Sequence, residues 1–523
     1  MVQVKRTTSA LLVALLGAAG LVAWMAVSRA LAGPTCSISW NNAAGGSWAT
    51  VADWTDATTN MNRLPTSSDD VCITLPGTYT VTLDAGRTVK SLTLGAVPGA
   101  QTLAIPGSTS LTLTNPSSIA DSGILQLGTT AGVSSLSGST LTNDGMLQVA
   151  QGDGSARSLA INLTNNAGGT VDIASANATT NGAELITNQG SFVIESGASY
   201  SLSSVLSNAP SFANSGGTIT SHGSFLQNAG TFTQRGGTTA GNAVTINGAI
   251  LDDDTSAGAG SFLLSGSTTV TGTASSPGVA SGQTVTIDGN STTTLGTNLA
   301  NDGTIVVGDA ASGNTAINGG GHTLTNNGAL DTVQGGGGSR SLSTSVVNTS
   351  SGTVDVASAD TISNSAVTIT NDGSFTVEPT GAYTLSATLS NAPSFVNGGG
   401  SLVNSGTFLQ EAGTFTQSDG SLTGNAVTVS GATLDDDTSA GVGSFLLSGS
   451  ATLTGSSTSP GVAAGQTVTI DSNATTTLGT NVRNDGTILV GDAASGNTAI
   501  NGGGHTLTNN GALDTVQGGG GSR

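Results

Sequence analysis

The sequence holds one residue type in a pattern that could support chemistry, a run of three aspartates that occurs twice. The runs are Asp252, Asp253, Asp254 and Asp435, Asp436, Asp437. Neighbouring carboxylates repel one another, and along a strand only alternate side chains share a face. At a corner of the backbone, three carboxylates could instead surround Ca²⁺, which takes roughly 6–8 oxygen ligands. The nonapeptide calcium repeat GGxGxDxUx is absent, so we expect a solvated corner and keep a calcium site as the alternative.

Residues suited to catalysis are sparse in the rest of the chain. A polysaccharide lyase needs a basic residue beside acidic ligands, and a glycoside hydrolase needs two carboxylates, one with a raised pKa. The candidate bases Arg235, His222 and Arg483 each lack a basic counterpart in the other copy of the long repeat described below. His322 and His505 do correspond, but each follows three glycines, where a solvated corner is expected. We therefore predict no catalytic residue and no cofactor apart from the calcium alternative.

The chain has two cysteines, Cys36 and Cys72, and no CxxC motif. A redox or metal motif of the CxxC type is therefore excluded. In an oxidising compartment two such cysteines are expected to pair. We predict a disulfide that closes a loop of about 35 residues and stabilises it by roughly 3–4 kcal/mol in the chain-entropy model.

The charge balance restricts the partners of this protein. Only 8% of the residues are charged, and 31 acidic residues face 11 basic ones, for a net charge of −20. Binding to nucleic acid or to an anionic membrane requires clustered cations, so we predict neither. The mean hydropathy of +0.11, together with short alternating runs of Val, Ile, Leu and Thr, argues against a disordered chain.

The N-terminal segment 1–32 has the features of an export signal. Lys5 and Arg6 precede an apolar run over residues 11–27, and the sequence ALA ends at Ala32. A cleavable signal peptide has this order of basic, apolar and small residues, whereas a membrane anchor needs roughly 20 apolar residues. We predict a signal peptide over residues 1–32 and a secreted or cell-surface location, with an uncleaved anchor as the alternative.

The rest of the chain is a tandem array of long repeats. The sequence GHTLTNNGALDTVQGGGGSR begins at Gly321 and again at Gly504, and Arg157, Arg340 and Arg523 fall at matching positions, one repeat length apart. Long identical stretches without insertions indicate an array of repeats. We expect unit 1 over residues 157–339, unit 2 over 340–523, and a diverged partial repeat over 97–156 that ends the same way. We expect the chain to stop at a seam between units.

Each unit contains a finer pattern of an Asn- or Ser-led turn with glycine, followed by a short alternating strand. Examples begin at Asn143, Asn301 and Asn484. Where the turns are consecutive they recur every 21 to 24 residues, as at Gly145, Gly169 and Gly190. This spacing predicts one coil of a solenoid, with Asn and Gly providing left-handed backbone at the corners. We predict an all-β protein, an elongated parallel β-helix (β-solenoid), with coils about 4.8 Å apart and a length on the order of 100 Å.

The segment 33–96 differs from the repeats and is expected to cap the N-terminal end of the solenoid. It holds Trp40, Trp48 and Trp54, both cysteines and the last lysine of the sequence. A cap covers strand edges that would otherwise aggregate. We predict a small disulfide-containing domain with its own aromatic core, and keep a carbohydrate-binding platform of exposed tryptophans as the alternative.

This segment resembles the N-terminal region of large bacterial surface proteins, whose pattern is W…G.W….NW…P…D.V.I…YTVTL…V.SLTLG. It follows this pattern from Trp40 to Gly95, except that Asp53 stands where the pattern has Asn. The coils LTNNGAL and NDGTIVV are similar to the repeats of filamentous-haemagglutinin-like adhesins and of autotransporter-associated β-strand repeats. The resemblance implies an exported, surface-displayed β-helix that is adhesive or structural. It implies no catalytic residue.

These observations predict an adhesin-like or structural stalk that is not an enzyme. Its partners would be extracellular glycans or neighbouring cell-surface molecules, and identical faces on the two units would engage them together through multivalency. A polysaccharide-active enzyme on the same scaffold is the alternative function. An ice-binding face is a third possibility, although Thr-x-Thr pairs do not recur in every coil.

Overall fold

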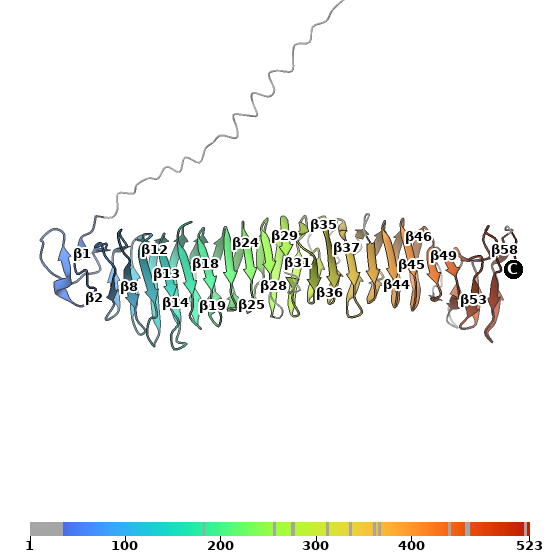
Figure 1. Cartoon of the computed structure of the whole chain (residues 1–523), viewed down its shortest axis with the longest axis horizontal. Helices are drawn as coiled ribbons and strands as arrows, with labels where there is room; N and C mark the ends of the chain where they lie inside the picture. Colours follow the sequence, from blue (N-terminus) through green and yellow to red (C-terminus); the bar gives the residue numbers. More distant parts are fainter. Residues whose placement is uncertain are drawn as a thin grey trace, which may run out of the picture.

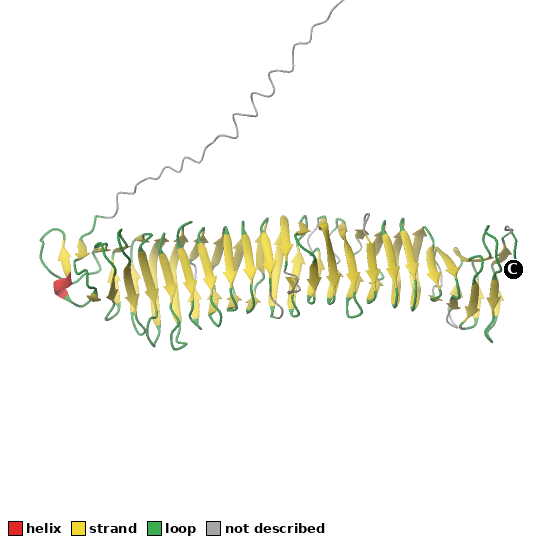
Figure 2. Cartoon of the chain, viewed as in Figure 1, coloured by secondary structure: helices red, strands yellow, loops and turns green. Residues whose placement is uncertain are grey.

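The computed structural model describes residues 35–180, 184–254, 258–272, 278–309, 313–333, 337–358, 362–364, 368–437, 441–455, 461–516 and 520–523. The predicted signal peptide over residues 1–32 lies outside these ranges. The described chain forms a long stack of coils (Figure 1), and strands make up almost all of its regular structure (Figure 2). Strands account for 57% of the described residues, in a parallel β-solenoid of about 19 turns. The predicted fold class is confirmed, and about 19 turns at roughly 4.8 Å each give a length of ~90 Å.

The solenoid has three sides, which we name A, B and C, and the chain visits them in the order B, A, C. Side A carries β5 (Tyr79–Thr82), β8 (Gln101–Ile105), β11 (Gly123–Leu127), β13 (Met146–Val149), β15 (Thr170–Ile173), β18 (Ser191–Ile194), β21 (Ser211–Asn214), β24 (Thr231–Gln234), β27 (Ile250–Asp253), β29 (Ser267–Thr271), β32 (Thr292–Leu295), β39 (Ile362–Asn364), β42 (Ala382–Leu385), the first parts of β35 (Thr315–Asn326) and β37 (Arg340–Asn348), and the last parts of β44 (Ser394–Asn404) and β46 (Thr414–Gly424).

Side B carries β4 (Asp70–Ile73), β7 (Ser91–Leu94), β10 (Ser117–Ile119), the last parts of β12 (Ser134–Asn143) and β14 (Arg157–Asn165), β17 (Leu185–Asn188), β20 (Val205–Asn208), β23 (Ser224–Gln227), β26 (Val244–Asn247), β28 (Gly260–Ser265), β31 (Gln283–Ile287), β34 (Thr304–Val307), β36 (Ala329–Thr332), β38 (Thr353–Val356), β41 (Ser374–Val377), the first parts of β44 and β46, β48 (Thr433–Asp436), β50 (Thr452–Thr454), β53 (Thr475–Leu478) and β56 (Ala499–Asn501).

Side C is built in two stretches. The first contains β6 (Arg87–Val89), β9 (Ser110–Leu113), the first parts of β12 and β14, β16 (Ala178–Thr180), β19 (Ser199–Leu202), β22 (Thr218–Ser221) and β25 (Thr238–Gly241). The second contains β30 (Gly278–Val279), β33 (Leu299–Asn301), the last parts of β35 and β37, β40 (Thr368–Asn371), β43 (Thr388–Asn391), β45 (Thr407–Gln410), β47 (Val427–Ser430), β49 (Gly443–Ser448), β52 (Gln466–Ile470), β55 (Thr487–Val490) and β58 (Ala512–Thr515).

Each strand buries alternate side chains, as the period of two predicts. In β34, Ile305 and Val307 are buried while Thr304 and Val306 are partly exposed. Larger side chains stack along the interior: the rings of Phe212 and Phe232 lie 5.4 Å apart and parallel within 2°. The burial of one apolar row per strand on three sides forms a continuous core along the rod.

The asparagines of the repeated turns have a different role from the one predicted. Among the described residues, the only non-glycine residues with positive φ are Asn60, Ser108, Asn290 and Asn473, so the motif asparagines are not left-handed. They are buried and form ladders instead: Asn143 Nδ2 donates to Asn165 Oδ1 (2.6 Å), and Asn165 Nδ2 donates to Asn188 Oδ1 (2.6 Å). A second ladder runs from Asn301 to Gln410 through Asn326, Asn348, Asn371 and Asn391. The amides satisfy one another from coil to coil inside the core.

The glycine of the same turn is needed for close packing of coils. Gly303 has no positive φ, but a Cβ on it would lie 2.4 Å from the carbonyl oxygen of Ala280 in the coil before. Glycine therefore allows the backbones of successive coils to approach each other at this corner.

The two long repeats do not present the same side of the rod. β27 of unit 1 lies on side A, and its counterpart in unit 2, β48, lies on side B. Likewise β17 lies on side B and its counterpart β40 lies on side C. A unit does not contain a whole number of turns, so unit 2 is turned by one side relative to unit 1. Equivalent faces of the two units therefore point to different sides of the rod.

The N-terminal end departs from the parallel pattern. β1 (Ile38–Trp40) pairs antiparallel with β3 (Trp54–Asp56), the one antiparallel pair between the strands that the structure describes, and it pairs parallel with β4. β2 (Gly46–Ser47) joins the edge of β5, and a short 3₁₀ turn over Val51–Asp53 precedes β3. Because β4 already belongs to side B, the ladder shows no break at the expected boundary near residue 96.

Three tryptophans fill this end. Trp40, Trp48 and Trp54 are at most 2% exposed, and the ring of Trp54 lies 5.0 Å from that of Trp40 and 4.6 Å from that of Trp48. Trp54 Nε1 donates to the carbonyl of Trp48 (2.8 Å). These rings form an aromatic core, so the alternative of a sugar-stacking platform built on them is wrong.

Candidate functional site

The aspartate runs lie mostly within strands, so their side chains alternate between the core and the surface. Asp253 of β27 and Asp436 of β48 are 0% exposed, and their neighbours Asp252 and Asp435 point outward. Thr271 donates to Asp252 Oδ1, and Thr454 donates to Asp435 Oδ1, each at 2.7 Å. The expectation of a solvated corner is wrong for Asp252, Asp253, Asp435 and Asp436, which are strand residues.

This alternation also bears on the calcium alternative. Carboxylates on opposite faces of a strand cannot surround one ion, and in the described residues no group of three or more His, Cys, Asp or Glu side chains is placed to hold a metal. Burial, reinforced by the charge of Asp252 and opposed by Arg235, raises the pKa of Asp254. Calcium binding at these runs stays a prediction that the geometry does not favour.

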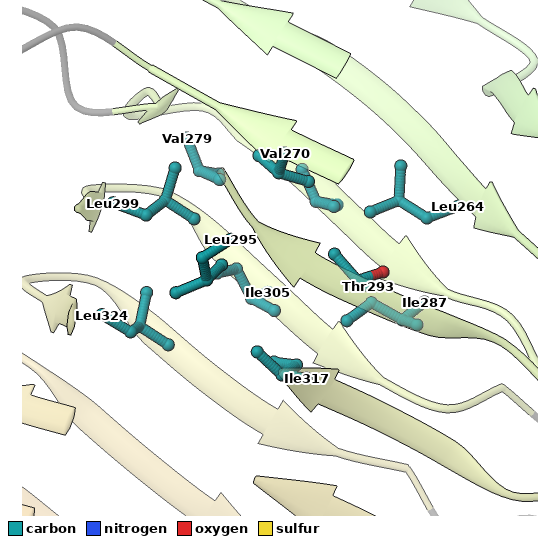
Figure 3. A pocket seen from close by; sticks show the side chains of 11 residues that line it. Leu264, Val270, Val279, Ile287, Thr293, Leu295, Leu299, Ile305, Ile317 and Leu324 are labelled. Atoms are coloured by element: carbon teal, nitrogen blue, oxygen red, sulfur yellow. The ribbon is translucent and has the colours of Figure 1, made fainter. Parts of the chain in front are cut away.

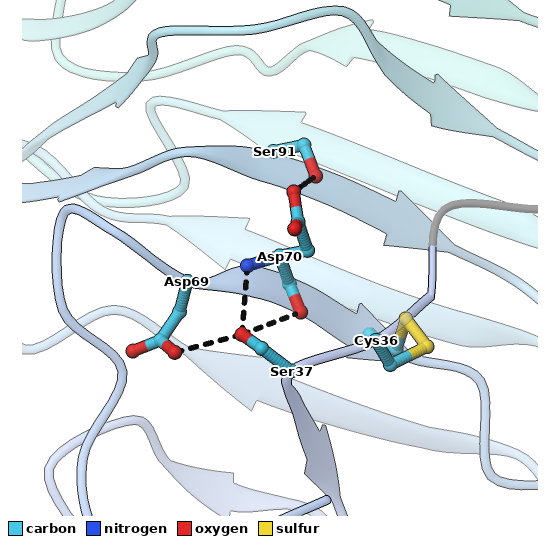
Figure 4. The surroundings of a disulfide bond; sticks show 6 residues. Cys36, Ser37, Asp69, Asp70 and Ser91 are labelled. Carbon is cyan, nitrogen blue, oxygen red and sulfur yellow. Dashed lines mark hydrogen bonds between the residues drawn. A yellow bond between two sulfur atoms is a disulfide. The ribbon is translucent and has the colours of Figure 1, made fainter.

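The predicted disulfide joins Cys36 to Cys72, with their Cα atoms 5.7 Å apart (Figure 4). Beside it, Ser37 Oγ donates to Asp69 Oδ1 (2.7 Å) and accepts from the backbone N–H of Asp70 (2.9 Å). Ser91 Oγ donates to Asp70 Oδ1 (2.6 Å). The bond and these contacts tie the first described strand to the side B ladder.

A network of charges stabilises the loop between β3 and β4. Arg63 binds Asp56 and Asp69, each with a nitrogen–oxygen distance of 2.6 Å. Hydrogen bonds from the backbone N–H of Thr59 and from Arg63 lower the pKa of Asp56 to about 2. Hydrogen bonds from Arg63 also hold the pKa of Asp69 well below its usual range. Both carboxylates are fixed in the charged form, as in a structural ion-pair network.

The candidate bases lie at separate positions. His222 is in the turn between β22 and β23, whereas Arg235 follows β24 at another corner. Arg483 in unit 2 forms a partly exposed ion pair with Asp485 (3.0 Å). His505 is exposed, as expected for a solvated position, whereas His322 is partly buried within β35.

One acidic pair was not recognised from the sequence. Asp331 of β36 and Asp355 of β38 are direct neighbours on side B, and both are partly buried on its outer face. Burial raises the pKa of both, and for Asp355 the charges of Glu378 and Asp331 add to the effect. At the matching positions of the preceding repeat, Gln148 Nε2 donates to Asp172 Oδ2 (2.9 Å). The pair escaped recognition because it depends on the register between successive coils.

One cavity in the interior of unit 1 is apolar. A small cavity between the coils near residues 264–324 is lined by aliphatic side chains (Figure 3). Thr293 is the one polar side chain in the lining, and its hydroxyl bonds to that of Thr268 (2.9 Å). Apolar cavities of this kind stay dry and bind no polar ligand.

Comparison with other proteins adds no further constraint on this geometry. No family model matches the chain, and no similar protein was found among curated proteins or solved structures. Within the described residues, none of the helical structure is long and apolar enough to span a bilayer. The structure shows a three-sided β-solenoid with a disulfide near its N-terminal end.

Proposed function

We propose that this chain is an exported, surface-displayed scaffold, an adhesin-like or structural stalk that acts through contacts and not through catalysis. Three features support the proposal: the signal-like N-terminus, the resemblance of residues 40–95 to bacterial surface proteins, and the long solenoid itself. The expected partners are extracellular glycans or neighbouring cell-surface molecules.

The observation that carries this proposal is the chemistry of the outer face of side B. One outward row in register is formed by short side chains, nearly all of them hydroxylic: Ser261, Thr284, Thr304, Ala329, Thr353, Ser374, Ser394, Thr414, Thr433 and Thr452. Hydroxyls about 4.8 Å apart both donate and accept hydrogen bonds. Such a row suits many weak contacts with a hydroxylated polymer laid along the rod.

The neighbouring outward row is less regular. Val306, Asp331 and Asp355 interrupt it, so Thr-x-Thr pairs do not continue from coil to coil. An ice-binding face would need an uninterrupted, uncharged array, and we do not propose one.

The rotation of unit 2 relative to unit 1 changes how multivalent binding would operate. Because unit 2 is turned by one side, equivalent surfaces point in different directions around the rod axis. Such a rod would bridge partners on several sides, as a cross-linker in a surface layer does, instead of attaching along one line. Linked weak sites still gain avidity when the partner surrounds the rod.

Surface display and adhesion are tested together in the source cells. Antibody against the purified chain should label intact cells, and external protease should remove the label. Deleting the gene should reduce attachment to a glycan-coated surface. Labelling only after permeabilisation, or unchanged attachment, would contradict the proposal.

A further inference from the structure

A depression on unit 1 has the composition of a binding site. It lies where three successive coils enter side B, at the starts of β17, β20 and β23. The lining residues are Glu184, Leu185, Ser203, Ser204, Val205, Gly223 and Ser224. None of the proposed functions above uses these residues.

Two polar groups in this depression have no protein partner. Glu184 Oε2 is shielded from solvent and accepts no hydrogen bond, and Ser204, only 7% exposed, has a hydroxyl without a partner. A buried polar atom without a partner costs roughly 1–3 kcal/mol. A ligand that donates to both oxygens would recover this energy.

Apolar side chains form the rim beside these groups. Leu185 and Val205 are neighbours in register, and they are 48% and 40% exposed. In unit 2 the corresponding residues are Thr368 and Thr388, so the apolar rim belongs to unit 1. The counterparts of Glu184 and Ser204 are Val367 and Ala387, which cannot supply the same oxygens.

The backbone around the depression is held in place from both sides. The side chain of Asn162 accepts from the N–H of Leu185 (2.8 Å), and Asn242 Nδ2 donates to the carbonyl of Gly223 (2.8 Å). A Cβ on Gly223 would lie 1.8 Å from the carbonyl oxygen of Ser204, so glycine keeps these coils close together. The site is therefore preorganised, which lowers the cost of binding.

We propose that this depression binds an alkylammonium group. Glu184 provides the negative charge, Ser204 provides a second acceptor, and Leu185 and Val205 contact the carbon chain. The lining contains no cationic side chain, and the net charge of −20 favours a cationic ligand. The same chemistry occurs in a lysine side chain and in an amino sugar. The site does not depend on the proposed role in adhesion.

The test uses the full chain and n-butylammonium chloride, with binding followed by ligand-observed NMR and calorimetry. We expect weak, saturable binding, and no binding of the neutral isostere 1-butanol or of butyrate at the same concentration. Nα-acetyl-lysine amide and glucosamine, compared in parallel, distinguish the two sources of the amine. Equal binding of 1-butanol, or no binding of butylammonium, would overturn the proposal.

Variants connect the binding to these residues. Glu184→Gln should weaken butylammonium binding about tenfold, because a charge-assisted hydrogen bond is lost. Ser204→Ala should weaken it several-fold and should fold, since unit 2 has Ala387 at this position. Glu411→Gln is the matched control, because Glu411 is an exposed carboxylate of unit 2 that accepts from Ser390. The assignment would be refuted if Glu184→Gln bound butylammonium with unchanged affinity. It would also be refuted if Ca²⁺ displaced butylammonium more than Na⁺ does at equal ionic strength.

Discussion

Arg157 provides the most direct perturbation of the core, because it is a cation buried at the start of a repeat. It is 0% exposed. Its Nη1 donates to the carbonyls of Gly132 (2.8 Å) and Ser155 (2.7 Å), and its Nη2 donates to those of Gly128 and Thr130 (3.3 Å each). Nη1 also makes a longer hydrogen bond to the carbonyl of Ala156 (3.4 Å), so one side chain holds five carbonyls from neighbouring segments.

Arg157→Met should destabilise the surrounding coils by about 4 kcal/mol, at roughly 1 kcal/mol for each of the four carbonyls with the shorter hydrogen bonds. Because coils contact only their neighbours, the loss should be local. Hydrogen exchange followed by mass spectrometry measures the free energy of local opening in peptides that cover β12 to β16. Arg483→Met is the control, since its side chain is 45% exposed in a surface ion pair, and it should change stability by less than about 0.5 kcal/mol.

A second substitution tests the geometry of the same site. A Cβ on Gly128 would lie 1.7 Å from Arg157 Nε, so Gly128→Ala should be strongly destabilising. In an Arg157→Ala background the clashing atoms Cδ, Nε and Cζ are absent, while the strain at the positive φ of Gly128 (79°) remains in both backgrounds. The double-mutant cycle should show a coupling of about 1–3 kcal/mol. A coupling near zero, or a loss below about 1 kcal/mol for Arg157→Met, would refute this reasoning.

Three further predictions concern charge, acid and coil packing. Asp331→Gln should stabilise the coils around β36 by about 1 kcal/mol at pH 7, because it removes the repulsion from Asp355 and provides a hydrogen-bond donor to that carboxylate. The gain in stability should shrink as acid protonates the two carboxyls, whose pKa values are raised. The N-terminal end should lose stability as the pH falls from about 4 to about 2, because the pKa of Asp56 is about 2 in the fold and about 3.9 in an unfolded chain; tryptophan fluorescence reports this. Gly303→Ala should destabilise its coil by about 1–3 kcal/mol through overpacking, whereas Gly168→Ala, with no contact under 3.6 Å, should have little effect.

Each of these has a clear contrary outcome. Thermal melts that show no gain for Asp331→Gln at pH 7, or an equal gain at pH 3, would contradict the raised pKa values. If the acid transition in tryptophan fluorescence is unchanged in Asp56→Asn, the loss of stability in acid is not caused by protonation of Asp56. Equal hydrogen-exchange rates in Gly303→Ala and Gly168→Ala would show that coil spacing is not limiting at that corner.

The sequence was sufficient to predict the fold class, since a period of two within strands combined with turns that recur at similar short intervals has few solutions. The disulfide also followed, because Cys36 and Cys72 are the only cysteines. The strand pattern is a local signal, and the disulfide depends on a single possible pairing, so neither needs the alignment of distant coils. The sequence left open whether Trp40, Trp48 and Trp54 are buried or exposed, because the spacing of residues along the chain does not show their exposure.

Other features depend on the register between coils, which the sequence does not reveal. The role of Asn143 and Asn301 in buried ladders appears only when neighbouring coils are aligned. The turn of unit 2 by one side depends on the number of strands that each unit contributes. The depression at Glu184 and Ser204 combines residues from successive coils, so no linear motif marks it.

The central claim is that this rod acts through contacts and not through catalysis. The most direct measurement incubates the purified chain with a panel of extracellular polysaccharides and follows, in the same samples, retention of the protein and the appearance of reducing or unsaturated chain ends. The account predicts retention on at least one polysaccharide with no increase in chain ends over time. Accumulation of new ends with any polysaccharide, or retention on none of them, would contradict it.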